Sequence, residues 1–534
     1  MRIHGLIFGL LFIAITPAIA QNTTVELQKG AGRLIGGIKN GERVERVIKG
    51  EQQVKFVQNT TTIFCDSAWF FRSRNAVEAF GNVRILEGDS ITITARQLQY
   101  DGNTKQAKLR NNVVFTKLAQ AKLYTDFLDY DRIINEARYY NGGKLVDSIN
   151  TLVSRKGYYD ATTNFASFKK DVKVTNPDYT MTSDSMRYNS KTKVIYFVAE
   201  TDVIDKDTNT FNYQSGIYNT INRTFDSNNG IGRNRNYSVK AKKISVDDIK
   251  KISRARGDVV MTSLEENMTI YSQAADTYNN NFAKIYDRAY VAKVTEEGDT
   301  LFMTADTLVS IDDVDPAKKR LLAYHNVKIF KRDLQGKADS LEYRSADSTL
   351  YFYKNPVLWT DGNQMTADSI SMLIERNTIS KIFMNVNSFV ISKDTSENFN
   401  QIKGRKMVAD FRAGKLSKVF VNGNGESIYF AIDEKTGILT GMNNVTCSNI
   451  IIKFKEGKVN SISFIKLPDG NFIPPHELEE ENTRLQDFKW RAEERPLKKD
   501  VVKEESQSEA APAKAEPKNL TPDTEKKAPR KRAS

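Results

Sequence analysis

The sequence predicts an all-β protein, an elongated antiparallel β-jellyroll or solenoid of about twelve repeats of about 30 residues, open at its ends. Two observations predict this class. A short phrase recurs at nearly constant spacing, and the apolar residues inside each copy alternate as they do along a strand. The phrase runs apolar, any, small, then usually Asp. Its clearest copies are Met181-Thr182-Ser183-Asp184, Met303-Thr304-Ala305-Asp306 and Met365-Thr366-Ala367-Asp368.

Copies of the phrase extend over most of the chain. Anchored on the small or polar residue, they lie at Cys65, Ala95, Thr125, Ser154, Ser183, Gln214, Ala241, Ala275, Ala305, Ala338, Ala367 and Gly404. The copies at Gln214 and Ala275 are degenerate. A period that persists over this length is typical of one stacked array rather than of several unrelated domains.

Each small residue is predicted to mark a corner where a strand changes direction. Ile93 and Ala95 share one strand face, whereas Leu98 and Tyr100 alternate on the opposite parity. Both pairs can face one interior only if the chain bends or bulges near Arg96. Asp is a poor strand former whose side chain bonds to nearby backbone, so the Asp residues are interpreted as solvated corners and not as catalytic groups.

Polar stretches between the apolar runs predict how neighbouring strands are joined. Residues 100–104, 188–192 and 278–281 are typical of hairpin loops. A second phrase, seen as Gly81-Asn82-Val83 and His325-Asn326-Val327, is interpreted as a turn followed by an alternating strand, which makes His325 a turn residue. Short loops join antiparallel neighbours, so an antiparallel array is favoured over a parallel β-helix.

The two ends differ from the array, which is placed at 46–467. Met1-Arg2, the apolar run 6–15 and the small residues 18–20 indicate a signal peptide at 1–20, so the chain is expected to be exported. The polar, Gly-rich stretch 21–45 is interpreted as a lead-in. Pro474-Pro475 before residues 476–494 predicts one amphipathic helix, which makes 468–497 a short helical segment. Residues 498–534 are rich in Lys, Glu, Ala and Pro and are predicted to be a disordered charged tail.

Cysteine and charge content narrow the class of partner. Cys65 and Cys447 lie at opposite ends of the array, too far apart for a disulfide, and are expected to be two buried thiols. The net charge of +13 from 79 basic and 66 acidic residues is compatible with an anionic glycolipid, a polysaccharide or a membrane surface. Nucleic acid is disfavoured as a partner, because the chain carries an export signal and no aromatic-basic cluster.

Motifs for catalysis, metals and cofactors are scarce. Beyond the signal peptide the chain has only His325 and His476, so a histidine metal site or a Ser-His triad lacks its parts. The sequence has no P-loop and no Gly-x-Ser-x-Gly elbow. Carboxylates are plentiful, but no pair stands out. The prediction is therefore a protein that is not an enzyme and has no cofactor, no metal and no catalytic residue.

The most distinctive chemical feature is a long apolar interior. Its sheets either close on a dry core or separate into a continuous trough, and the periodicity alone favours the dry core. The candidate lining residues are the inward-facing set: Ile93, Leu98, Tyr100, Met181, Met186, Tyr188, Met303, Leu308, Leu341, Tyr343, Met365, Ile370 and Met372. Met among them suits adaptable contact with lipid, since its side chain is flexible and polarizable.

The repeated Met-x-Ala-Asp-x-Leu and Gly-Asn-Val phrases resemble those of the OstA/LptA family of lipopolysaccharide-transport proteins. Residues 402–407 also resemble the family pattern, with Arg405 where Asp is usual. The resemblance covers residues 45–465. It implies an open, twisted β-jellyroll that holds the acyl chains of lipid A inside and leaves the sugars outside.

The same resemblance implies partners and a location. Family members join end to end through exposed edge strands and bridge the periplasm of Gram-negative bacteria to the outer-membrane translocon. Lipopolysaccharide, inner- and outer-membrane transport components and further copies of this chain are therefore the implied partners. The array is much longer than the small bridge protein of the family, so one molecule could replace several stacked ones.

Two other classes of protein are compatible with the repeats. A polysaccharide-active β-solenoid would gather Asp, Arg or Lys across adjacent turns of one outer face. A structural or adhesive repeat protein would have a closed core and bind no lipid.

Overall fold

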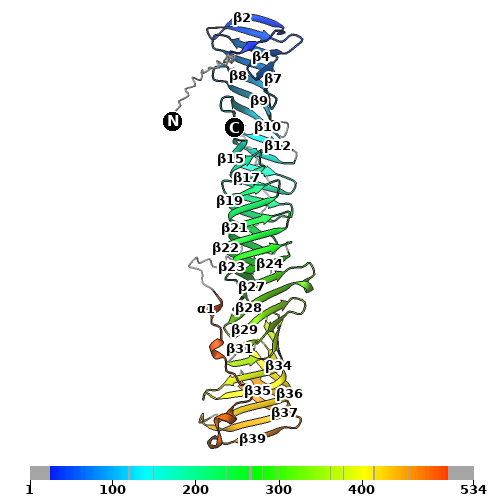
Figure 1. The fold of residues 1–534 in the computed structure, drawn as a ribbon, viewed down its shortest axis with the longest axis vertical. Coiled ribbons are helices and arrows are strands. Elements are labelled where there is room, and N and C mark those ends of the chain that lie inside the picture. The colour runs from blue at the N-terminus through cyan, green and yellow to red at the C-terminus, as the bar shows by residue number, and fades with distance from the viewer. Residues whose placement is uncertain are drawn as a thin grey trace, which may run out of the picture.

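The computed structural model describes residues 24–502, apart from 118–120, 148, 236, 264–266, 280, 296–297, 361, 377, 413–414, 434 and 456–457. These residues form a long rod (Figure 1). In the described part of the chain, 39 strands join in one continuous sheet, and every pairing is antiparallel. The all-β antiparallel class predicted from the repeats is therefore confirmed.

The strands follow one another along the rod from the N-terminal end. The first part contains β1 (Glu26–Leu27), β2 (Arg33–Lys39), β3 (Glu42–Ile48), β4 (Val54–Gln58), β5 (Thr61–Cys65), β6 (Ser67–Phe71), β7 (Ala76–Glu87), β8 (Ile91–Asp101), β9 (Gln106–Lys117), β10 (Ala121–Asp131), β11 (Glu136–Tyr139), β12 (Gly143–Val146), β13 (Thr151–Ser154), β14 (Lys156–Asp160) and β15 (Phe165–Thr175). The middle part contains β16 (Tyr179–Asn189), β17 (Val194–Phe197), β18 (Thr201–Asp205), β19 (Thr210–Asn219), β20 (Thr224–Arg233), β21 (Tyr237–Asp247), β22 (Ile252–Ser263), β23 (Met268–Tyr278), β24 (Phe282–Tyr286), β25 (Tyr290–Val294), β26 (Thr300–Thr304) and β27 (Thr307–Ile311).

The last part contains β28 (Arg320–Lys331), β29 (Leu334–Arg344), β30 (Thr349–Tyr353), β31 (Val357–Thr360), β32 (Asn363–Thr366), β33 (Ser369–Glu375), β34 (Thr378–Lys393), β35 (Phe399–Arg412), β36 (Lys415–Ile432), β37 (Leu439–Lys455), β38 (Lys458–Ile465) and β39 (Asp469–Ile473). The helices are all short: the 3-10 helices η1 (Pro316–Lys318), η2 (Pro475–Glu477), η3 (Glu480–Thr483) and η4 (Ala492–Glu494), and the single-turn α1 (Lys498–Val501). No helix in the described residues is long and apolar enough to cross a membrane.

One repeat consists of two bent strands. β8 runs from one side of the rod to the other and β9 runs back, with the register between them shifting at Thr94/Gln97. The shift lies beside Ala95, where the sequence predicts a corner. In several units the corner breaks a strand in two, as between β26 and β27, which both pair with β28.

A pair of side chains on neighbouring strands explains both repeated phrases. The corner Asp accepts a hydrogen bond from the Asn of the second phrase: Asn82 Nδ2 to Asp66 Oδ2 is 2.6 Å, and Asn326 Nδ2 to Asp306 Oδ2 is 2.8 Å. Asn82 and the Gly81 before it both have positive φ, as do Asn326 and His325. We predicted that the second phrase is a turn. It is instead a two-residue left-handed bulge inside a long strand.

Two corners lie elsewhere than the sequence phrase predicts. On β23 the register shift faces Ser272–Ala274, so the corner of this unit is at Ser272 and not at Ala275. On β19 the pairing skips Gln214, which makes Tyr213 the inward corner residue. In both units Gln replaces the corner Asp, as Gln273 and Gln214. Without the Asp, the sequence does not mark the corner clearly. The predicted corner is three residues too late on β23 and one residue too late on β19.

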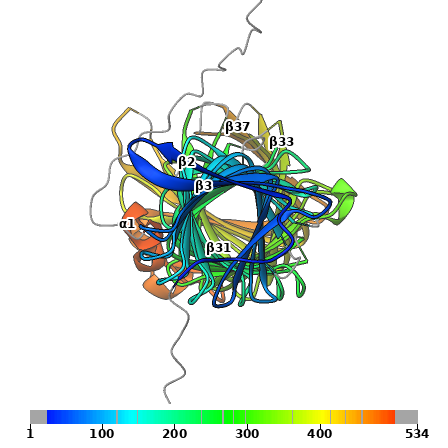
Figure 2. The same cartoon turned by 90° about the horizontal axis from the view of Figure 1, so that it is seen from above.

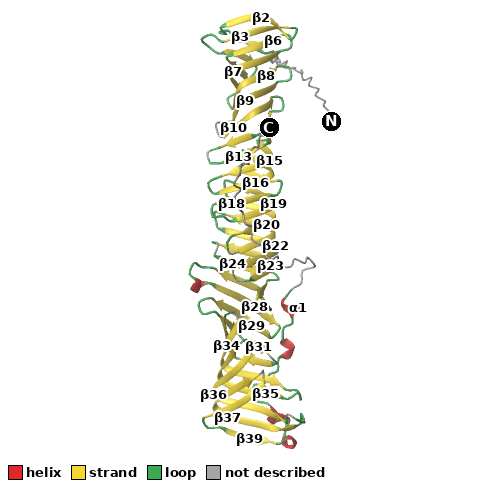
Figure 3. Ribbon diagram, turned by 180° about the vertical axis from the view of Figure 1, so that it is seen from behind, coloured by secondary structure: helices red, strands yellow, loops and turns green. Residues whose placement is uncertain are grey.

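The hairpin loops repeat one local device. Asp101 Oδ1 accepts hydrogen bonds from the backbone N–H groups of Asn103 and Thr104, at 2.9 and 3.1 Å. Asp131 and Asp160 cap their loops in the same way. The loops line both sides of the rod (Figure 3), as the predicted hairpins require.

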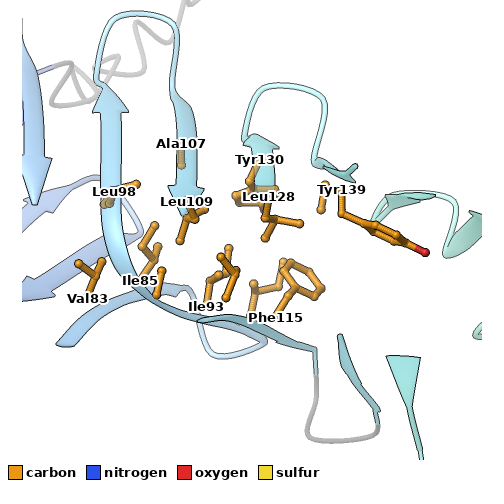
Figure 4. Close-up of a cluster of buried hydrophobic side chains, with 14 of the residues drawn as sticks. Val83, Ile85, Ile93, Leu98, Ala107, Leu109, Phe115, Leu128, Tyr130 and Tyr139 are labelled. Carbon is orange, nitrogen blue, oxygen red and sulfur yellow. The ribbon is translucent and has the colours of Figure 1, made fainter. Parts of the chain in front are cut away.

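Each bent strand contributes to two arms whose inner faces meet. Figure 4 shows Ile85, Ile93 and Phe115 on one arm pointing toward Leu109 and Leu128 on the other. These five side chains are buried, the aliphatic ones almost completely. Seen along the long axis, the strands enclose this apolar interior, and the C-terminal segment lies outside them (Figure 2).

The two ends of the array differ from the prediction. The stretch 21–45, interpreted as a lead-in, contains β1, β2 and most of β3. The single amphipathic helix predicted over 476–494 is absent from these described residues: they form an extended segment with η2, η3 and η4. Phe488 and Trp490 both lie against the Phe399 ring although they are two residues apart, a spacing that places side chains on one face of an extended chain but not of a helix.

The tail predicted to be disordered from 498 begins with residues that are in contact with the rod. Residues 498–501 form α1, which lies against β26 and β28, and Val501 is completely buried. The signal peptide at 1–20 and residues 503–534 lie outside the described residues. Cys65 and Cys447 are both buried and free, as expected, and burial raises the pKa of the Cys65 thiol to about 12.

Candidate functional site

The predicted lining residues all occupy inward-facing positions of the array. Eleven of them have exposed fractions of 5% or less: Ile93, Leu98, Tyr100, Met181, Met186, Met303, Leu308, Leu341, Met365, Ile370 and Met372. Tyr188 and Tyr343 are half-buried. The structure therefore brings these residues into one interior, but most of them are core residues that solvent does not reach.

The interior is most accessible in the middle of the rod, in β19, β20 and β21, which we name the central section (residues 210–247). At the position two residues before the corner, Ile93 and Met303 are buried, whereas Phe211 and Val239 are half-buried. Three residues after the corner, Leu308 is buried and Ile244 is half-buried. Two residues before the corner, Leu152 and Ile402 of other units are half-buried as well, so it is the position three residues after the corner that distinguishes the central section.

The apolar core divides at the same place. One cluster of fully buried side chains ends at Phe197, and the next begins at Ala241. Between them, inward-facing Tyr218 and Phe225 are only partly buried against the first cluster, and Val239 and Ile244 against the second.

Small residues in β20 account for this accessibility. Along β9 the inward residues opposite β8 include Leu109, Val113 and Phe115, whereas the equivalent residues of β20 are Ser227, Gly230 and Gly232. β20 therefore supplies less side-chain volume to the interior than β9 does.

Aromatic rings lie against the wall over these glycines. A Cβ on Gly232 would lie 3.0 Å from the Phe211 ring, and one on Gly230 would lie 2.8 Å from the Tyr213 ring. The Phe211 and Tyr213 rings are stacked on each other, and Phe225 contacts Tyr213 with ring centroids 4.5 Å apart. The section thus has an aromatic wall in which Phe211 and Phe225 are half-buried, and such a wall suits contact with an apolar ligand.

Nearer the N-terminal end, polar side chains of one row of hairpin loops reach residues of the other row. We name the line along which the two rows face each other the seam. Arg132, from the loop after β10, donates to both carboxylate oxygens of Glu87, the last residue of β7, at 2.6 and 3.0 Å. Arg132 also donates to the Tyr100 hydroxyl at 2.9 Å, and this hydroxyl donates to Gln58 at 2.5 Å. We name these four residues the seam latch.

Burial determines how the latch behaves chemically. The side chains of Arg132 and Glu87 are only 7% and 16% exposed. Burial alone would raise the pKa of Glu87, but hydrogen bonds from Arg132, Thr60 and Thr61 outweigh it and leave this pKa below its ordinary value. Burial also raises the pKa of Tyr100, which keeps its hydroxyl protonated as a donor.

A second crossing lies one unit further along. Lys117 donates to the Tyr159 hydroxyl, the Ala161 carbonyl and the Asn164 side chain at 3.0 to 3.1 Å. Lys117 ends β9 on one side of the seam, and its three acceptors belong to the hairpin on the other side. Between β4 and β15, hydrogen bonds therefore join the two sides of the seam at two places, in addition to the apolar packing.

Sequence reasoning missed the residues that distinguish this site. The latch partners Glu87 and Arg132 are 45 residues apart, and neither stands out in the phrase. The glycines of β20 gave a detectable signal, since they fall at inward positions of a unit that the periodicity marks as degenerate. Among the described residues, no group of His, Cys, Asp or Glu is arranged to hold a metal ion.

The geometry defines a class of protein. It is an elongated β-jellyroll whose apolar interior is bridged by hydrogen bonds near one end and is partly accessible in the middle. A family profile described as OstA-like protein matches residues 37–184. A second, described as LptA/(LptD N-terminal domain) LPS transport protein, matches residues 238–378. The chain belongs to the OstA/LptA-like family of lipopolysaccharide-transport proteins, as its repeated phrases indicated.

A solved structure is also similar to part of the chain. It is LptH from Pseudomonas aeruginosa, described as the LptA-homologous periplasmic component of the lipopolysaccharide transport device. The identity is 16%, the match covers 21% of this chain and 79% of LptH, and the TM-score is 0.19. No curated protein matches the chain.

Proposed function

We propose that this protein carries lipopolysaccharide in the periplasm, with the acyl chains of lipid A inside the rod and the sugars outside the seam. The observation that supports this most directly is the central section, where inward-facing Phe211, Tyr218, Val239 and Ile244 stay partly exposed between the two clusters of buried side chains. A purely structural repeat protein gains nothing from exposing such residues, whereas a lipid carrier needs them.

Burial of acyl chains supplies the binding energy. Each CH₂ group transferred from water to an apolar surface contributes about 0.8 kcal/mol, so even part of one acyl chain binds measurably. No chemical step is required of the protein, which agrees with the transport role of its family. Directed movement of the lipid requires energy from a partner.

The two ends of the rod offer surfaces for such partners. At the N-terminal end, β2 pairs only with β3 among the described strands and exposes Leu34, Ile35 and Ile38. At the other end, β39 pairs with β37 and exposes Phe472. Unpaired backbone beside exposed apolar side chains favours strand addition, so we assign these edges to inner- and outer-membrane transport components or to further copies of the chain.

Substitutions in the central section test the proposal. Replacing Val239 and Ile244 with Asn puts polar groups on the accessible wall, and we expect purified protein to bind lipopolysaccharide at least tenfold more weakly. Replacing the neighbouring outward-facing Ser238 and Ser245 with Asn is the matched control and should leave binding unchanged. Fluorescence titration with labelled lipopolysaccharide measures the affinity, and circular dichroism checks the fold. Equal binding by a well-folded double variant and its control would contradict the proposal.

A further inference from the structure

The segment after β39 turns back and runs along the outside of the rod. It starts at Pro474, passes through η2, η3 and η4, and ends at α1 beside β26 and β28 (Figure 1). We name residues 475–502 the strap. Its course is opposite to that of the array, so successive strap residues meet units that lie progressively earlier in the sequence.

The strap contacts one outward position, three residues before the corner, in each of the four successive units whose corners are Ala305, Ala338, Ala367 and Gly404. These positions hold Phe302, Gln335, Gln364 and Gln401. The three glutamines have exposed fractions of at most 2%, which is unusual for an outward-facing polar residue. In the preceding units the same position holds only Thr, Ser or Lys: Thr62, Thr92, Lys122, Thr151, Thr180, Thr210, Ser238 and Thr269. The sequence thus changes at this one repeat position where the strap is present.

Two of the glutamines bind the strap backbone in the same way. Gln364 donates to the Lys489 carbonyl and accepts from the Arg491 N–H, both at 2.7 Å. Gln401 donates to the Thr483 carbonyl and accepts from the N–H of Leu485, both at 2.8 Å. One carboxamide therefore satisfies a carbonyl and an N–H two residues apart, as a neighbouring strand would.

Side chains of the strap add contacts between these points. Glu494 pairs with Lys337 at 2.6 Å, and Asp487 pairs with Lys403 at 3.0 Å. The rings of Phe488 and Trp490 lie 5.3 and 5.2 Å from the ring of Phe399.

The strap ends in a further pair of contacts. Lys498 lies over the Phe302 ring at 5.0 Å, and Val501 is completely buried. The hydrogen bonds to the glutamines are thus accompanied by charge and apolar contacts along the whole strap.

We propose that the outer face formed by β26, β29, β32 and β35 is a binding track for an extended polypeptide, and that the strap is its own separable ligand. The glutamines bind the backbone of the polypeptide, while Lys337, Lys403 and Phe399 select its acidic and aromatic side chains. Docking draws the chain away from β39, so the terminal edge strand stays clear for a partner. It also joins four units that otherwise contact only their neighbours, so strap release loosens the C-terminal end of the rod.

Peptide exchange on the full-length chain tests the track. In one variant the strap is weakened by Trp490→Ala and Val501→Asp, while the track is unchanged. A fluorescent peptide with the sequence of residues 476–502 should bind this variant saturably, at least tenfold more tightly than the unaltered chain, whose track is occupied. Adding Gln364→Ala and Gln401→Ala should abolish the binding, whereas Gln97→Ala and Gln106→Ala, on distant exposed glutamines, should not. Binding that ignores the track glutamines, or no peptide binding to the weakened chain, would overturn the proposal.

Hydrogen exchange of the unaltered strap gives an independent readout. The N–H groups of Arg491 and Leu485 should exchange slowly, and Gln364→Ala should accelerate Arg491 at least tenfold. Exchange of Arg491 that is fast in both proteins would contradict docking in solution. Strap exchange between two copies would give a dimer on gel filtration, and this outcome would overturn the assignment of the strap as a ligand of its own chain.

Discussion

Replacing Arg132 with Met is expected to lower the free energy of unfolding by about 3–5 kcal/mol, because it leaves the buried Glu87 carboxylate without its charged partner. The Tyr100 hydroxyl also loses a donor at 2.9 Å. Chemical denaturation followed by circular dichroism measures the loss. As a control, Arg155→Met breaks a pair with Asp171 whose side chains are 72% and 68% exposed, and should cost less than about 1 kcal/mol. Equal effects of the two substitutions would show that the latch is not buried in solution.

The latch also predicts a pH dependence. The folded-state pKa of Glu87 lies below its unfolded value, so its stabilising contribution is present at neutral pH. That contribution is lost as the pH falls through the lowered pKa of Glu87 and its carboxylate is protonated in the folded protein. Glu87→Gln should therefore be less stable than the unaltered protein at pH 7, and the difference should shrink at low pH. A constant difference between pH 7 and pH 3 would contradict this assignment.

Replacing Leu308 with Asp is expected to unfold the second core cluster. Leu308 is completely buried, and a carboxylate there has no partner, so we expect a loss of at least about 4 kcal/mol in the free energy of unfolding. Hydrogen exchange should show loss of protection from β24 to β30 first. The neighbouring Thr307→Asp, at a partly exposed outward position, should change stability by less than about 1 kcal/mol. A stable Leu308→Asp protein would mean that solvent reaches the interior in this unit as well.

These effects differ from those expected in the central section. Val239 and Ile244 are half-buried, so Asn there should weaken lipid binding while costing little stability. Leu308 and Val239 both face inward in the repeat, and only the surrounding volume separates a core residue from a candidate contact residue.

The repeat made the fold predictable because its signals are local. The corner at Ala305-Asp306 and the hairpin after Asp101 each follow from residues within a few positions, so spacing and alternation were sufficient. The corners at Tyr213 and Ser272 were misplaced, since a Gln in place of the corner Asp removed the local signal while the strand pairing kept the geometry.

The remaining features depend on contacts between distant residues. Glu87 meets Arg132 only after the three further strands β8, β9 and β10 have been added, and Gln364 meets Lys489 across 125 residues. Nothing in the sequence around an outward-facing Gln indicates which distant residue it will contact. The predicted helix failed for the same reason: the strap residues are arranged by the track on which they lie and not by their own periodicity.

The sequence predicted a long apolar interior that either closes on a dry core or opens as a continuous trough, and the structure divides this interior into two clusters with a central section between them. The predicted lining residues from Ile93 to Met186 and from Met303 to Met372 belong mainly to closed parts. Of the accessible residues, Phe211 and Tyr218 lie in the unit that the periodicity marks as degenerate, where Gly230 and Gly232 replace larger side chains, and Val239 and Ile244 lie in the next unit. A departure from the repeat was the more informative signal for function.

Site-specific photocrosslinking in living Gram-negative cells tests the central claim most directly. A photoreactive residue at Ile244 faces the interior of the central section, and one at Ser245 faces outward on the same strand. We predict a lipopolysaccharide adduct from position 244 and none from 245. Well-folded protein without an adduct at 244, or with equal adducts at both positions, would contradict transport through the interior.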